Sequence, residues 1–181
     1  MLDKRILFNV ITSAMQNGAD FAEVFVEDRK NTTLVYSDKK IENAVLGNDF
    51  GVGIRVIKDF NTVYAYTNDV SEKNLIKVAK DAALGLKSGS LNKVMDFTNK
   101  NIERNNTPIK IYPADIDLSK KLDIIKETHD TIMNYDDIIV QASTGYLDSD
   151  QMVQIANSEG LMASDRRVRT RLIQNAVASY C

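Results

Sequence analysis

The spacing of apolar residues changes from helical to alternating and back within the first 86 residues. Residues 3–17 place Ile6, Leu7, Val10, Ile11, Ala14 and Met15 at helical intervals. Residues 20–28 alternate. Residues 31–66 carry β-branched and aromatic side chains in short runs, which are split by the turn signals Asp38-Lys39-Lys40, Gly47-Asn48-Asp49 and Lys58-Asp59-Phe60-Asn61. Residues 71–85 return to helical spacing. We predict a helix that packs on an antiparallel meander, followed by a second helix.

The remaining residues predict a second set of elements after a break. Residues 87–113 lose periodicity and contain both prolines, which indicates an extended linker. A helix is expected over residues 118–133. Two strands are expected next, at residues 137–147 and 151–157, joined by a turn at Asp148-Ser149-Asp150. Residues 168–180 are expected to form a further strand or a pair of strands.

These patterns predict an α+β protein of two related units, each a curved, mainly antiparallel β-sheet with helices packed on one side. The units are expected at residues 1–86 and 114–181. At an offset of 116 residues Val24 falls on Val140 and Arg55 on Arg171, which favours an internal duplication. The second unit then lacks a counterpart of the helix at 71–85 and looks truncated.

Composition narrows the class of protein without indicating a reaction. The 181 residues carry a formal net charge of -2, which gives no general attraction to nucleic acid or to an anionic membrane. No apolar run approaches the roughly 20 residues of a membrane span, and the N-terminus has no apolar signal core. A single cysteine suits a reducing compartment. We therefore expect a cytoplasmic protein.

Four segments, in order along the chain, resemble the N-terminal part of the TldD/PmbA family. They are Gly18–Val24, Ser37–Asn43, Gly51–Val56 and Asn157–Leu161. Members of this family are described as modulators of DNA gyrase and as zinc metallopeptidases that mature or degrade peptides. The resemblance implies a peptide substrate in the full-length protein, and a homodimer or a heterodimer with a paralogue.

The zinc site implied by the resemblance does not map onto this chain. In the family it resembles a His-Glu-x-x-x-His helix, and no His-Glu pair exists here. We therefore predict no catalytic, cofactor-binding or metal residue in this chain and no activity of the chain alone. Zinc is expected only in the full-length family protein.

Two lone residues are candidates for chemistry, and each has a simpler explanation: a structural or surface role for His129, and an incidental position for Cys181. His129 is the only histidine and lies in a predicted amphipathic helix, whereas a zinc peptidase helix needs two histidines. Cys181 ends the chain without a neighbouring histidine to activate a thiol.

Three further patterns have a structural and a functional interpretation. Gly51-x-Gly53 lacks the third glycine of a dinucleotide-binding loop and indicates a bulge or a close approach by another backbone. Arg167, Arg169 and Arg171 share one strand face, either as a solvated surface or as a site for a peptide carboxylate or phosphate backbone. The pairs Asp136/Asp137 and Asp148/Asp150 are expected in turns rather than as acid–base or metal carboxylates.

The leading hypothesis is the non-catalytic N-terminal portion of a TldD/PmbA-type zinc metallopeptidase, which helps to form the cleft and the dimer. The alternative is a binding or regulatory module such as a DNA gyrase modulator. A third possibility is a duplicated domain that binds a small molecule, for which the sequence offers no pocket signature. A membrane is not expected as a partner, and neither is nucleic acid.

Overall fold

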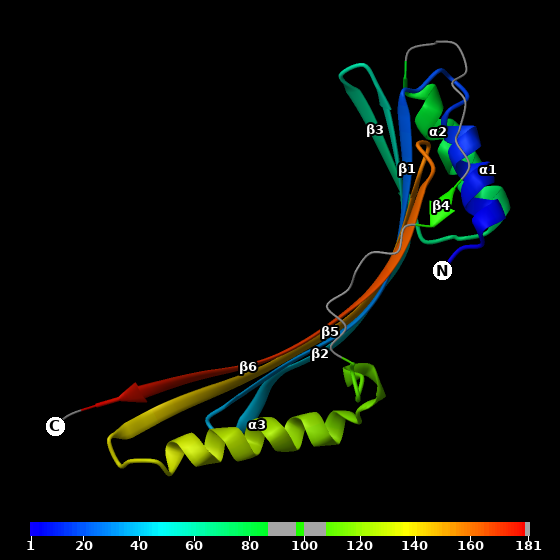
Figure 1. Cartoon of the computed structure of the whole chain (residues 1–181). Coiled ribbons are helices and arrows are strands. Elements are labelled where there is room, and N and C mark those ends of the chain that lie inside the picture. The colour runs from blue at the N-terminus through cyan, green and yellow to red at the C-terminus, as the bar shows by residue number, and fades with distance from the viewer. Residues whose placement is uncertain (87–96, 100–107, 180–181) are drawn as a thin grey trace. The chain divides into compact units, whose positions relative to one another are not determined.

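The computed structural model describes residues 1–86, 97–99 and 108–179. Six strands form one sheet in the order β3-β2-β1-β5-β6-β4 (Figure 1). The helices are α1 (Lys4–Ala14), α2 (Glu72–Leu84), α3 (Leu118–Met133) and the 3-10 turn η1 (Pro113–Asp115). The strands are β1 (Phe21–Ser37), β2 (Lys40–Lys58), β3 (Asn61–Thr67), β4 (Thr98–Asn99), β5 (Ile139–Asn157) and β6 (Leu161–Ala178).

The chain divides into two compact units that interleave along the sequence. Unit 1 comprises Met1–Asp28, Asp49–Asn106 and Met152–Arg166, and unit 2 comprises Arg29–Asn48, Thr107–Gln151 and Arg167–Cys181. Each of the four long strands therefore contributes one stretch to each unit.

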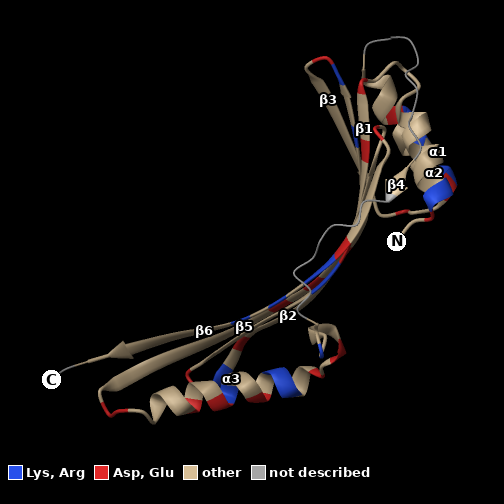
Figure 2. Cartoon of the chain, viewed as in Figure 1, with Lys and Arg blue, Asp and Glu red and all other residues tan. Residues whose placement is uncertain are grey.

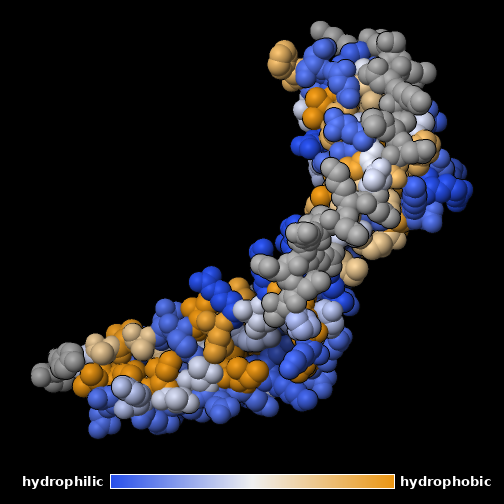
Figure 3. Space-filling view, in the orientation of Figure 1, coloured by the Kyte–Doolittle hydropathy of each residue, from blue (hydrophilic) through white to orange (hydrophobic). Residues whose placement is uncertain are grey.

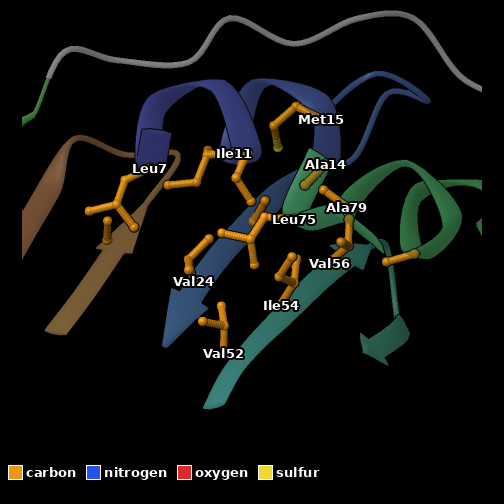
Figure 4. Packing of buried hydrophobic residues seen from close by; sticks show 14 of the residues in the cluster. Leu7, Ile11, Ala14, Met15, Val24, Val52, Ile54, Val56, Leu75 and Ala79 are labelled. Atoms are coloured by element: carbon orange, nitrogen blue, oxygen red, sulfur yellow. The ribbon is translucent and has the colours of Figure 1, made fainter. Parts of the chain in front are cut away.

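Unit 1 packs α1 and α2 side by side on one face of its strands (Figure 1). Alternation along β2 turns Val52, Ile54 and Val56 toward the helices, where all three are fully buried. They meet a stripe of apolar residues on the two helices, including Leu7, Ile11, Leu75 and Ala79 (Figure 4). Polar contacts join the helices at their edges, where Asn9 Nδ2 donates to Glu72 Oε1 at 2.8 Å.

Unit 2 packs α3 along its strands (Figure 1). Leu34 and Tyr36 of β1, Ile125 of α3 and Tyr146 of β5 form its apolar cluster. The outward side of α3 carries both positive and negative side chains (Figure 2). One face of the helix is thus buried and the other is solvated, as its amphipathic pattern predicts.

The predicted turns are partly right. β2 pairs with β3 through a tight turn in which Lys58 lies opposite Asn61, and Asp59 adopts a φ of 52° there. The β1–β2 turn has positive φ at Asp38 and Lys39, as the Asp-Lys-Lys signal indicated.

Two predicted breaks are wrong. Gly47-Asn48-Asp49 lies inside the continuous strand β2. Asp148-Ser149-Asp150 lies inside the continuous strand β5, where Asp148 and Asp150 are buried. Tertiary pairing overrides local turn preference at both places.

The predicted fold class is confirmed: α+β, mainly antiparallel, with helices on one face of the strands in each unit. A helix followed by two long strands occurs twice, as α1-β1-β2 and α3-β5-β6. The 116-residue duplication and the division into residues 1–86 and 114–181 stay predictions. Most of the expected linker, residues 87–96 and 100–107, lies outside the described residues, whereas Phe97 is buried in unit 1.

Candidate functional site

A buried ion pair joins α3 to the strands of unit 2. Lys121 Nζ donates to Asp148 Oδ2 at 2.6 Å and to Thr32 Oγ1 at 3.1 Å. Lys121 is only 4% exposed and Asp148 only 6%. Because two charges buried in this way must be paired and hydrogen-bonded, the contact fixes α3 at one position on the sheet.

Tyr146 extends this polar group along β5. The Lys121 ammonium lies 5.9 Å from the centroid of the Tyr146 ring. Burial, and after it the neighbouring Asp148 carboxylate, raise the pKa of Tyr146 to about 12. The phenol of Tyr146 therefore keeps its proton to a higher pH than that of a free tyrosine.

The opposite face of the same strands holds a hollow rich in basic side chains. Alternation turns Thr32 and Asp148 toward α3, so their sequence neighbours lie on the other face. A cavity of about 320 Å³ lies there. We call it the basic hollow and define it by six of its lining residues: Arg29, Asn31, Thr33, Ser149, Arg169 and Arg171. Leu147 and Asp148 complete its lining, and the Asp148 carboxylate is paired with Lys121.

The basic hollow uses two of the three arginines singled out in the sequence. Arg169 and Arg171 of β6 line it, whereas Arg167 does not. Strands β1 and β5 contribute the other side chains. Among them is Arg29, which already interacts with another group of this protein. Sequence reasoning missed Arg29 because only the strand order brings β1 within two strands of β6.

The buried ion pair is the other feature that sequence reasoning missed. Asp148 was assigned to a turn, and Lys121 was not singled out. A signal existed, because Lys121 precedes Ile125 and His129 by one and two helical turns and so shares their buried face. A lysine on an apolar face needs a buried anion.

His129 lies inside unit 2. It is 2% exposed, its ring meets that of Tyr36 edge-to-face at 4.9 Å, and its Nδ1 lies 3.3 Å from Asp130 Oδ1. These contacts agree with the structural interpretation of this residue. Cys181 lies outside the described residues.

Tyrosine side chains, rather than another backbone, approach the two strand glycines. A Cβ placed on Gly53 would overlap the Tyr64 hydroxyl oxygen, and one placed on Gly51 would overlap that of Tyr66. The Tyr66 hydroxyl donates to the Phe50 carbonyl oxygen at 3.2 Å. The sequence analysis expected a bulge or another backbone at these glycines, whereas the groups that approach them are aromatic side chains of the neighbouring strand β3.

The described residues do not provide a ligand set for the zinc ion that the family resemblance implies. Structural and catalytic zinc sites need at least three His, Cys, Asp or Glu ligands around one point. No such group exists among residues 1–86, 97–99 and 108–179. Asp148 is paired with Lys121, and Asp136 accepts a hydrogen bond from the Ile138 backbone N–H at 3.0 Å.

No helix in the part of the chain described here is both long and apolar enough to cross a membrane.

Comparisons with known proteins define the class. Residues 22–84 match the model "PmbA/TldA metallopeptidase domain 1", and residues 111–180 match "PmbA/TldA metallopeptidase central domain". The two matches follow one another along the chain, in the order that the model names give. The chain therefore has the domains of a metallopeptidase family.

The chain belongs to the PmbA/TldD family. It is 22% identical over 174 residues to a metalloprotease of Methanothermobacter thermautotrophicus, covering 91% of this chain and 36% of the relative. It is 19% identical over 151 residues to a metalloprotease TldD homolog of Buchnera aphidicola, covering 82% of this chain and 30% of the relative.

Solved structures share the fold. The crystal structure of a proposed modulator of a DNA gyrase from Thermotoga maritima superimposes with a TM-score of 0.74 at 17% identity. That match covers 97% of this chain and 40% of the other. The chain thus spans about a third of the two curated relatives and two fifths of this structural neighbour.

Proposed function

We propose that this chain is the non-catalytic N-terminal portion of a zinc metallopeptidase of the PmbA/TldD family, acting in the cytoplasm on peptides. The observation that supports this proposal is the pair of consecutive matches to the first and central domains. The metal and the water that it activates would come from polypeptide outside residues 1–181.

The contribution of this chain would be to hold an extended peptide and to form the wall of a cleft. Beyond Val52–Lys58, which pair with β3, the remainder of β2 has no pairing partner on that side among the described residues. An open strand edge can bind an extended peptide through main-chain hydrogen bonds that do not depend on its sequence.

The proposed dimer, with a second copy or with a paralogue, has candidate surface in unit 2. Apolar side chains are exposed at separate places there: Val45 (48%) and Leu46 (64%) lie on opposite faces of β2, and Leu172 (45%) and Val177 (51%) lie on β6. Apolar residues lie beside hydrophilic ones on the surface (Figure 3). Light scattering of the purified chain would measure its mass, and a strict monomer at all concentrations would contradict self-association through any of these side chains.

The test of the proposed function is the reading frame after residue 181. We expect a His-Glu-x-x-x-His segment within roughly one domain length, and chelator-sensitive peptide hydrolysis by the longer product. A frame that closes without such a segment, or a longer product whose peptide hydrolysis is unaffected by chelation, would refute the assignment.

A further inference from the structure

The basic hollow of unit 2 concentrates positive charge on one face of the sheet. Arg169 and Arg171 lie two positions apart on β6, which places their backbones about 6.6–6.8 Å apart along the strand. Neither makes an ion pair or a hydrogen bond with any of the described residues. Two like charges this close repel each other, so an anion bound between them would be stabilised by both.

Neutral polar groups of the hollow extend what it can recognise. Thr33 and Ser149 place hydroxyl groups in its lining. Asn31 Oδ1 is buried and has no hydrogen-bond partner among the described residues. This oxygen has almost no accessible surface and lies against Gly47 of β2, so the hydroxyl groups of Thr33 and Ser149 are the neutral groups that a ligand could meet.

These groups together define the chemistry of the ligand. Guanidinium groups bind carboxylates through paired, charge-assisted hydrogen bonds, and the hydroxyl groups of Thr33 and Ser149 can accept a hydrogen bond from a donor such as a backbone amide. A peptide with acidic side chains carries both groups. A volume of about 320 Å³ lies at the lower end of the range for small-ligand sites and suits one or two residues of a peptide.

Nucleic acid fits the hollow less well. A single-stranded nucleic acid needs aromatic rings on which its bases stack, and no aromatic side chain lines this hollow. The formal net charge of -2 also offers no broad electrostatic attraction to a phosphate backbone.

We propose that the basic hollow is a binding site for an acidic peptide, in which Arg169 and Arg171 hold a carboxylate of an Asp or Glu side chain. The proposal rests on the proposed function for its choice of a peptide. It adds a preference for acidic sequence that the open strand edge of β2 would not impose.

The first test compares two blocked tripeptides that differ only in charge. Titration calorimetry of the purified chain would measure binding of acetyl-Glu-Ala-Glu-amide and of acetyl-Gln-Ala-Gln-amide, with inorganic phosphate as a third probe. We expect the acidic peptide to bind about tenfold or more tightly than the neutral one. Its affinity should fall as salt is raised from low to physiological ionic strength.

The second test uses matched variants. Arg169→Gln with Arg171→Gln should lower the affinity for the acidic peptide about tenfold or more. Lys120→Gln with Lys126→Gln removes the same charge from exposed positions on α3 and should leave that affinity within about twofold. All four side chains are exposed, so neither variant is expected to unfold the chain.

Several results would overturn the inference. They are equal binding of the two peptides, no binding of the acidic peptide at millimolar concentration, tighter binding of phosphate than of the acidic peptide, or equal losses in the two double variants. Such results would leave the metallopeptidase assignment standing, because that assignment is tested by hydrolysis in the longer product.

Discussion

At the scale of single residues, the buried contact between Lys121 and Asp148 is the most consequential interaction of unit 2. Its nitrogen and oxygen lie 2.6 Å apart, and both side chains are about 5% exposed. Such a pair need not stabilise the fold relative to apolar residues, but the loss of one member leaves a buried charge without its partner.

Replacing Lys121 by Met should therefore destabilise the chain by about 3–5 kcal/mol. The free energy of unfolding from urea titration measures the change. Lys120→Met, on the exposed side of the same helix, is the control and should change it by less than about 0.5 kcal/mol.

The double variant Lys121→Met with Asp148→Asn separates the charge from the packing. Because it removes the unpaired carboxylate, it should recover a large part of the lost stability. A double variant as unstable as Lys121→Met alone would show that packing, not charge, sets the cost.

The phenol of Tyr146 predicts how stability depends on alkaline pH. Its pKa is raised from 10.0 to about 12 in the folded chain. Below pH 10 the phenol is protonated in both states. Between pH 10 and 12 the unfolded chain releases this proton first, so stability falls as pH rises through that window.

Tyr146→Phe has no proton to lose at this position and should show a smaller decline of stability over the same window. Urea midpoints measured from pH 8 to pH 12 for both proteins test this prediction. Parallel curves would mean that Tyr146 ionises alike in the folded and unfolded chains.

Single-residue chemistry was only partly predictable from sequence. The grouping of Arg169 with Arg171 followed from strand alternation, which is local. Asp148 was misassigned because Asp and Ser favour turns, and its cation lies 27 residues away on another element. Local preference cannot reveal a pairing of that kind.

At the scale of elements, helices were predicted better than strands. The ends of α1, α2 and α3 lie within a few residues of the predicted ones, because apolar periodicity and capping residues are local. The long strands were predicted as shorter pieces, since Gly47 and Asp148 look like breaks. Because β2 and β5 pair with neighbouring strands, both remain continuous at these positions.

The start of α1 offers a direct test of local capping. Asp3 Oδ1 accepts a hydrogen bond from the Arg5 backbone N–H at 2.8 Å. Asp3→Ala should lower the free energy of unfolding by about 1 kcal/mol, whereas Asp3→Asn keeps a capping oxygen and should cost little. Equal losses for the two variants in urea titration would attribute the effect to charge rather than to the cap.

At the scale of the whole molecule, the sequence predicted the class of fold and the family, and both are confirmed. It did not predict how the units interleave, because each long strand serves two units and no local signal marks the residue where one unit gives way to the other. The division predicted from the sequence, at residues 1–86 and 114–181, therefore differs from the division into two compact units that the contacts give.

The central claim is that residues 1–181 form a scaffold without the hydrolytic centre of their family. The most direct measurement incubates the purified chain with a mixture of unstructured peptides and added zinc, with and without a chelator, and follows cleavage by mass spectrometry. We predict no products beyond those of a blank without protein, under either condition. Peptide cleavage that co-purifies with the chain and is abolished by the chelator would contradict the account.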